Sequence, residues 1–340
     1  MKFFDSFYKN KVFLNSVAGV LFFVLGFTSH YLINRYFPKE TSQPLRPGVY
    51  GKLTDPLIGI IIPEEVGKEK YHLLLSHLGK YISESKRENK VQDVSVYFRS
   101  LKKGEWIAIN QDEKFSPASM LKVMVLMAYL KIAEIAPQTL DHKILYDGTF
   151  NKNANLNYQP SSSLKSGKFY TVSELLGRMV QYSDNNAVHL LFKEDTINIS
   201  SLQFLFAYLG LVVPDFYNDS DTISTKEYSR FYRVLYGATY LNQAMSERAL
   251  DMLTKTNFND GIVAGIPADI QVAHKFGERS LILPSADTVI KELHDCGIIY
   301  YPKNPYFLCV MTRGVDFNIL SSFIKEVSAI VYKEVKKFPI

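Results

Sequence analysis

Three short motifs hold the residue types of a serine acyl-transfer site: Ser119-Met120-Leu121-Lys122, Ser183-Asp184-Asn185 and Lys275-Phe276-Gly277. A serine hydroxyl can attack an acyl carbon when a neighbouring base accepts its proton, and a lysine with a lowered pKa can be that base. Ser-x-x-Lys alone is a weak signal, because it also begins at Ser6, Ser83, Ser100, Ser162 and Ser322. The surrounding sequence must select the relevant copy.

The context selects Ser119. Residues 120–130 are apolar nearly all round, which predicts a buried helix, and Lys122 is the only charge in it. Burial should lower the pKa of that amine, unless the lysine reaches the surface along its alkyl stem. Ser116-Pro117 predicts the helix start, with Ser116 as N-cap and Pro117 at the first helical position. Positions three apart share a helix face, so we expect the Lys122 amine beside the Ser119 hydroxyl.

With their flanking residues, the three motifs resemble those of the class A serine β-lactamases and the related penicillin-binding proteins. The segments that carry the resemblance are Phe115-Ser-Pro-Ala-Ser119-Met-Leu-Lys122, Tyr182-Ser-Asp-Asn185-Asn-Ala187 and Val272-Ala-His-Lys275-Phe-Gly277-Glu278. Three motifs in the family's order are far more specific than one. The resemblance covers residues 71–337 and implies an α+β fold, in which an antiparallel sheet is flanked by helices and joined by a helical subdomain.

The resemblance also implies catalytic roles. Ser119 would be the nucleophile that forms an acyl-enzyme, and Lys122 would handle its proton. Ser183 would relay a proton to the leaving amine. The backbone N–H groups of Ser119 and Glu278 would form the oxyanion hole.

Substrate binding would fall to the remaining motif residues. Asn185 would hold the substrate's amide side chain and help to fix Lys122. Lys275 would present a positive charge to the substrate carboxylate, and Gly277 would be the third substrate-binding residue. Each motif also has an ordinary structural interpretation, since Ser-Asp-Asn can cap a helix and Lys275 can be a solvated strand residue.

Two departures from the family pattern bear on turnover. Phe276 stands where the family usually has Thr or Ser, which removes a hydroxyl donor worth about 0.5–1.5 kcal/mol. The Glu-x-x-Leu-Asn segment that supplies the deacylating Glu in class A enzymes has no counterpart, because residues 211–220 contain no Glu. Asp215 and Asp219 are the acidic residues there, and both are better explained as turn residues. Fast β-lactam turnover is therefore not expected.

An uncharged stretch from Val12 to Ile33 is long enough to span a bilayer. A cleaved signal peptide is the alternative, but the stretch is long for one and lacks a clear cleavage site. We expect a stub at 1–11, a transmembrane signal anchor at 12–33, a linker at 34–65 and the catalytic domain at 66–340. The domain would lie on the extracytoplasmic side as part of a single-pass membrane protein.

The composition excludes several other classes. The chain has 340 residues, a net charge of +5 and 47% hydrophobic residues, which suits a folded domain with a sizeable core. Basic residues are scattered, so no nucleic-acid partner is expected. Seven His and two Cys show no metal-ligand spacing, and neither a metal nor a cofactor is called for. Cys296 and Cys309 flank the last hairpin and could face each other, but the register is not fixed, so we interpret them as core thiols.

Hydrophobic periodicity places strands at both ends of the domain and helices between them. The expected elements are a helix at 68–88, a hairpin at 94–98 and 106–109, a capping box at 171–174, a helix start at 221–224, strands at 270–276, 297–301 and 306–312, and a final helix at 319–336.

Three functions remain open. The first is a membrane-anchored β-lactamase-like serine hydrolase that acts on β-lactams or related amides and peptides. The second is a penicillin-binding D,D-carboxypeptidase-like enzyme that acts on cell-wall peptides. The third is a non-catalytic binding module of the same fold, against which the intact serines, lysines and asparagine of the motifs argue.

Overall fold

The computed structural model describes residues 51–55, 67, 69–193, 199–211, 222–283 and 288–337. The chain divides into two units, Met1–Pro47 and Gly48–Ile340, and every described element belongs to the second. The span expected at Val12–Ile33 lies outside the described residues. Within those ranges, no helix combines the length and the apolar character that a bilayer crossing needs.

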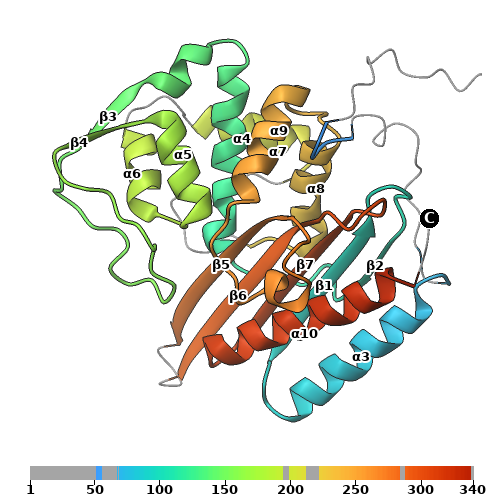
Figure 1. The fold of residues 1–340 in the computed structure, drawn as a ribbon. Helices are drawn as coiled ribbons and strands as arrows, with labels where there is room; N and C mark the ends of the chain where they lie inside the picture. The colour runs from blue at the N-terminus through green and yellow to red at the C-terminus, as the bar shows by residue number, and fades with distance from the viewer. Residues whose placement is uncertain are drawn as a thin grey trace, which may run out of the picture. The chain divides into compact units, whose positions relative to one another are not determined.

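A five-stranded antiparallel sheet forms the centre of the second unit (Figure 1). Its order is β2-β1-β7-β6-β5, so that β5 lies at an edge. The predicted first hairpin is confirmed, with Val96 opposite Ile109. The last strands are longer than predicted, because the β5–β6 pairing continues through the polar residues that follow Gly277. The strands are β1 (Asp93–Ser100), β2 (Trp106–Ile109), β5 (Val272–Leu283), β6 (Thr288–Ile299) and β7 (Tyr306–Gly314).

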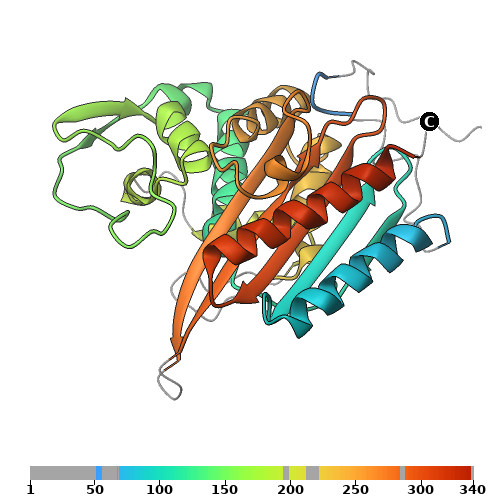
Figure 2. The same ribbon diagram turned by 60° about the horizontal axis from the view of Figure 1, so that its bottom comes forward.

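Two helices from opposite ends of this unit cover one face of the sheet, α3 (His72–Arg87) and α10 (Phe317–Val335), and they run side by side in Figure 2. The α10 helix begins where the Asp316 carboxylate accepts the N–H groups of Asn318 and Ile319, which have no partner within the helix. Its buried residues recur every three or four positions, so one stripe faces the sheet.

The helical subdomain covers the opposite face (Figure 1). The predicted capping box that starts α5 is confirmed, since Thr171 and Glu174 bond each other's backbone N–H groups. A second capping box starts α8, where Ser224 pairs with Glu227. The elements of this subdomain are η1 (Ala118–Leu121), α4 (Lys122–Ala133), η2 (Pro137–Asp141), β3 (Lys143–Tyr146), β4 (Lys168–Thr171), α5 (Val172–Gln181), α6 (Asn185–Lys193), α7 (Ile199–Tyr208), α8 (Thr225–Tyr236) and α9 (Gln243–Leu253), and η3 (Ile262–Gly265) lies against α10.

The described residues 51–55, which the sequence assigns to the linker, pack against this subdomain. Leu53 and Thr54 are buried, and the Glu247 carboxylate accepts both of their backbone N–H groups. The Asp55 N–H donates to Tyr236 O. These bonds satisfy backbone groups that burial would otherwise leave without partners.

One row of directly paired residues crosses β5, β6 and β7 at Lys275. Lys275 lies opposite Cys296, which lies opposite Cys309. The two cysteines form a disulfide with a Cα–Cα distance of 4.0 Å, so the interpretation as core thiols is wrong. The reason is the register, which only the assembled sheet fixes. Both cysteines pack in the core beneath the helical subdomain.

Candidate active site

Ser119 lies on a 3₁₀ turn, η1, that precedes the long buried helix α4. The predicted N-cap is wrong, because no side chain caps η1 and the Ser116 hydroxyl instead accepts a hydrogen bond from Arg279 Nη1 at 2.8 Å. The turn includes Ala118 at φ +46°, a left-handed conformation that alanine rarely adopts. Such backbone conformations persist where the surrounding structure holds them, commonly at functional sites.

Gly277 lets the edge strand β5 approach this turn. A Cβ at Gly277 would lie 3.0 Å from Pro117 O and 3.3 Å from Met120 N, and both are backbone atoms. The missing side chain therefore brings the turn that carries Ser119 against the strand that carries Glu278. Those two residues supply the backbone N–H groups of the expected oxyanion hole.

The Lys122 amine is buried among acceptors from the second motif. It donates to Ser183 O at 2.6 Å, to Asn185 Oδ1 at 2.6 Å and to Ser183 Oγ at 3.1 Å. Burial lowers the pKa of Lys122 to about 7, although the nearby charges of Asp184 and Glu278 oppose this shift. An amine with a pKa near 7 can both accept and return a proton at neutral pH.

The expected contact between Ser119 and Lys122 is not formed. The Ser119 hydroxyl is partly exposed and makes no hydrogen bond within the part of the chain that the structure describes. The Lys122 amine has at most three N–H donors, and Ser183 and Asn185 already accept them. Residues of the second motif, which lies far away in the sequence, therefore bond the Lys122 amine in place of Ser119.

Ser183 stands between two lysines. Its hydroxyl oxygen lies 3.1 Å from Lys122 Nζ and 3.0 Å from Lys275 Nζ, and its backbone has φ +56°. The Lys275 amine is fully buried and also donates to Phe276 O at 2.8 Å. Burial, followed by repulsion from the Lys122 amine, puts the pKa of Lys275 well below its ordinary value. The structure thus places Lys275 next to Ser183 rather than on an exposed surface.

Two residues that sequence reasoning missed fix the second motif. The buried Asp184 Oδ1 accepts the Asn186 N–H at 2.9 Å, which caps α6, and the Asn153 amide at 2.8 Å. Asn153 Oδ1 in turn accepts the Asn185 N–H at 2.8 Å. Asp184 carried a signal, its place inside the motif, whereas nothing in the sequence distinguished Asn153 from its neighbouring asparagines.

The Phe276 side chain lies in the core on the α10 side of the sheet. It stacks on Phe258 with a centroid distance of 4.3 Å, and Tyr158 contacts both rings edge-on. The third motif therefore offers an aromatic packing contact at the position where the family usually has a hydroxyl.

Glu278 holds the loop that carries Tyr158. Its carboxylate accepts the N–H groups of Tyr158 at 2.8 Å and Asn157 at 3.1 Å. The same loop is bonded to the second motif through Asn153, so residues 153–158, which we call the strap, connect Asp184 and Asn185 with β5. Burial raises the pKa of Glu278, and the two N–H bonds oppose that shift.

No group of His, Cys, Asp or Glu among the described residues is arranged to hold a metal ion. Asp215 and Asp219, the acidic residues weighed as replacements for the deacylating Glu, lie outside the described residues.

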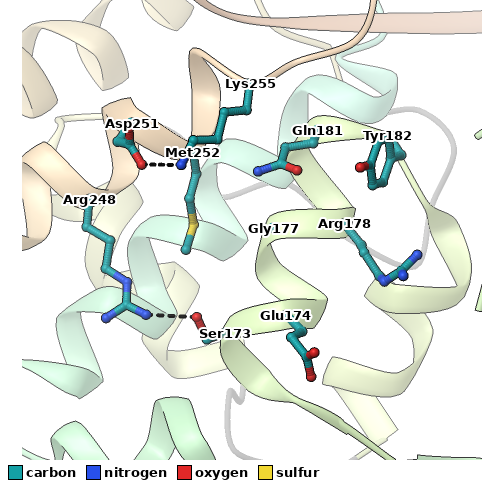
Figure 3. A pocket seen from close by; sticks show the side chains of 10 residues that line it. All are labelled: Ser173, Glu174, Gly177, Arg178, Gln181, Tyr182, Arg248, Asp251, Met252 and Lys255. Atoms are coloured by element: carbon teal, nitrogen blue, oxygen red, sulfur yellow. Dashed lines mark hydrogen bonds and ion pairs between the residues drawn. The ribbon is translucent and has the colours of Figure 1, made fainter. Parts of the chain in front are cut away.

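A separate hollow of about 460 Å³ lies between α5 and α9 (Figure 3). Arg248 donates to Ser173 Oγ at 2.8 Å on one side of it, and Lys255 pairs with Asp251 at 2.6 Å on another. Its lining residues come from α5, α9 and the residues that directly follow them, and none belongs to the three motifs. Because Arg248, Asp251 and Lys255 already have partners, we assign no chemistry to it.

The model of the Beta-lactamase enzyme family matches residues 77–335, which is most of the chain and includes all three motifs. The chain belongs to the β-lactamase enzyme family. The predicted family is thereby confirmed, as is the expected α+β fold with an antiparallel sheet flanked by helices.

Relatives within this β-lactamase family are distant. Beta-lactamase ROB-1 from Haemophilus influenzae is 29% identical over 101 residues, which span 30% of this chain and 31% of ROB-1. The carbapenem-hydrolyzing beta-lactamase KPC from Klebsiella oxytoca is 27% identical over 198 residues, which span 54% of this chain and 66% of KPC.

Solved structures share the fold. A mutant of PBP-A, in an acyl-enzyme complex with penicillin G, superposes with a TM-score of 0.63 at 22% identity, covering 78% of this chain and 98% of that protein. The ancestral class A beta-lactamase GNCA gives a TM-score of 0.61 at 23% identity, covering 75% of this chain and 99% of that protein. At these identities the likeness concerns the fold.

Proposed function

We propose that the chain is a serine hydrolase that cleaves an amide bond, in a β-lactam or a cell-wall peptide, through an acyl-enzyme on Ser119. The observation that carries the proposal is the buried Lys122 amine, whose pKa of about 7 makes it a usable base one turn from a partly exposed serine hydroxyl. We include in the proposal the membrane anchor at residues 12–33 and an extracytoplasmic catalytic domain.

In the acylation step, neutral Lys122 has two N–H donors, which the carbonyl of Ser183 and the amide oxygen of Asn185 accept. Its lone pair then receives the Ser119 proton, directly or through the Ser183 hydroxyl, as the serine oxygen bonds to the acyl carbon. The backbone N–H groups of Ser119 and Glu278 stabilise the oxyanion that forms.

The collapse of this intermediate breaks the bond between the acyl carbon and the leaving nitrogen. The nitrogen takes a proton from the Ser183 hydroxyl, and Lys122 returns a proton to Ser183. The position of Ser183 Oγ, about equally far from both lysine amines, suits such a relay. Lys275, in its protonated form, provides positive charge for a substrate carboxylate, and Asn185 binds the substrate's amide side chain.

Release of the acyl group needs a base that activates water, and residues 211–220 contain no Glu to serve as one. We therefore propose slow hydrolysis of a penicilloyl ester. The same absence is no obstacle to the second candidate, a penicillin-binding D,D-carboxypeptidase-like enzyme for cell-wall peptides, because that class does not depend on this Glu.

The test is intact-mass spectrometry of the full chain in detergent after incubation with a penicillin. We expect the mass of one whole penicillin on Ser119, retained for minutes or longer, and no adduct on a Ser119→Ala variant. Rapid multiple turnover would contradict slow release and point to Asp215, Asp219 or Lys122 as the deacylating base. If no β-lactam or acyl-peptide labels the protein or is turned over, the chain is a non-catalytic binding module.

A further inference from the structure

Ser116, which lies just before turn η1, is held by three side chains of the sheet. Each polar atom of Ser116 has a sheet partner. Its carbonyl oxygen lies 3.0 Å from His294 Nε2, its hydroxyl accepts from Arg279 Nη1 at 2.8 Å, and its N–H donates to Glu292 Oε2 at 3.3 Å. Ser116 is therefore fixed from β5 and β6, not by the helix that follows it.

The His294 contact has a defined direction. His294 is fully buried, and its Nδ1 accepts the backbone N–H of Thr312 at 3.2 Å. An imidazole that accepts at Nδ1 carries its proton on Nε2, so Nε2–H donates to Ser116 O. Burial lowers the pKa of His294 to about 3, and the neutral form persists at the pH of any acylation assay.

The Ser116 carbonyl is well placed to control the turn. The next residue, Pro117, has no N–H to offer, and Ala118 after it has φ +46°. Gly277 lies opposite His294 in the sheet, and its missing side chain leaves room for Pro117 O. The paired residues Gly277 and His294 thus both support the turn, Gly277 by leaving room for Pro117 O and His294 by its bond to Ser116 O.

The other two contacts of Ser116 are weaker constraints. Glu292 is bonded to the Arg313 guanidinium at 3.0 and 2.9 Å and reaches the Ser116 N–H only at 3.3 Å. Arg279 is partly exposed and bonds the hydroxyl, which can rotate, rather than the backbone.

We propose that His294 is a positioning residue for acyl transfer, whose Nε2–H bond to Ser116 O fixes the turn that aims the Ser119 N–H and hydroxyl at the acyl carbonyl. This inference rests on the proposed role of Ser119 as nucleophile. His294 exchanges no proton with the substrate and acts through Ser116.

Two substitutions test the two hydrogen bonds of the imidazole one at a time, because each keeps one bond and removes the other. In His294→Gln, the amide nitrogen takes the place of Nε2 and can still donate to Ser116 O. In His294→Asn, the amide oxygen takes the place of Nδ1 and can still accept from Thr312, but no donor reaches Ser116. We expect His294→Asn to slow acylation by a penicillin by about 10²-fold, the usual effect of a small misplacement, and His294→Gln to stay near the wild-type rate.

A thiol probe separates misplacement from loss of folding. Alkylation of a Ser119→Cys variant by iodoacetamide needs an accessible thiol but neither an oxyanion hole nor alignment with an acyl carbonyl, so adding His294→Asn should leave that rate unchanged. If His294→Asn does not fold, His294→Met removes both bonds at similar volume and should show the same 10²-fold loss of acylation.

Equal acylation rates for His294→Asn and the wild type, or equal losses for His294→Asn and His294→Gln, would overturn the inference. So would a changed alkylation rate of the double variant, in either direction, which would indicate a general structural role. If the wild type is not acylated at all, the proposed function is wrong and the positioning role falls with it.

Discussion

The chemistry of the site depends on two buried amines that share one serine hydroxyl. Lys122 and Lys275 lie on either side of Ser183 Oγ. Two positive charges this close and this deeply buried disfavour each other, so the pair holds fewer protons at neutral pH than two surface lysines would. Beside one hydroxyl, the two amines offer a base and a proton donor for the same transfer.

Replacing Lys122 by Met should slow acylation by at least the roughly 10²–10⁴-fold that proton transfer usually contributes. The base must be neutral, and its pKa is lowered to about 7, so wild-type acylation should rise with pH through about 7 and fall below it. The Met variant should lack this rise. Rate constants from stopped mass-spectrometric time courses between pH 5 and pH 9 would measure both effects. An unchanged rate would place the base elsewhere, and unfolding would indicate a structural role.

Replacing Lys275 by Ala tests charge recognition. If this amine serves the substrate carboxylate, acylation by carboxylate-bearing substrates should weaken more than acylation by neutral esters, because Phe276 supplies no hydroxyl to compensate. Matched substrates with a free and an esterified carboxylate would be compared by kcat/KM. An equal loss for both would instead assign Lys275 to the proton relay through Ser183.

At the scale of elements, the site is assembled from a turn, a helix start and a sheet edge. Turn η1 carries Ser119, α6 begins at Asn185 of the second motif, and edge strand β5 carries Lys275 to Glu278. The strap joins the last two, since Asn153 bonds the second motif and Glu278 bonds residues 157 and 158. The Glu278 carboxylate therefore bonds this loop to β5, alongside the ring contact between Tyr158 and Phe276.

Removing that carboxylate in Glu278→Ala should loosen the strap without touching the backbone N–H of the oxyanion hole. We expect faster amide hydrogen exchange at Asn157 and Tyr158, corresponding to about 1.5–3 kcal/mol less local stability, the usual worth of bonds to a charged group. The control is Glu174→Ala, which removes a comparable carboxylate from the α5 capping box and should leave both amides unchanged. Unaltered exchange in Glu278→Ala would mean that the packing of Tyr158 holds the strap by itself.

At the scale of the molecule, a sheet with a core on each face keeps the site rigid. The disulfide between Cys296 and Cys309 lies in the same register row as Lys275, on the face that supports the helical subdomain. Disulfides persist in oxidising compartments and are rare in the cytosol. This supports the proposal of an extracytoplasmic domain.

Cell fractionation tests that proposal for the full chain. With an uncleaved anchor at residues 12–33, the protein should stay with membranes after carbonate extraction and retain its original N-terminus. Maleimide applied under denaturing conditions should label neither of the two cysteines before reduction and both after it. Carbonate-soluble protein that starts after residue 33 would contradict the anchor, and thiols labelled before reduction would contradict the compartment.

The sequence by itself determined several elements and nominated residues for the site. Local signals were sufficient for the α5 capping box, for the first hairpin and for the apolar helix that carries Lys122, because capping, alternation and helical periodicity act between residues close in the chain. Motif order was enough to nominate Ser119, Lys122, Ser183 and Lys275.

Only the tertiary structure decided what these residues contact. Lys122 bonds Ser183 and Asn185 instead of its helical neighbour Ser119, and Ser116 is held by the sheet instead of capping a helix. The cysteines proved to be bonded because strand register put them opposite each other. In each case the partner lies outside the local stretch of sequence. Buried polar groups pair with such partners once burial has excluded water, and strand residues pair once the sheet has set the register.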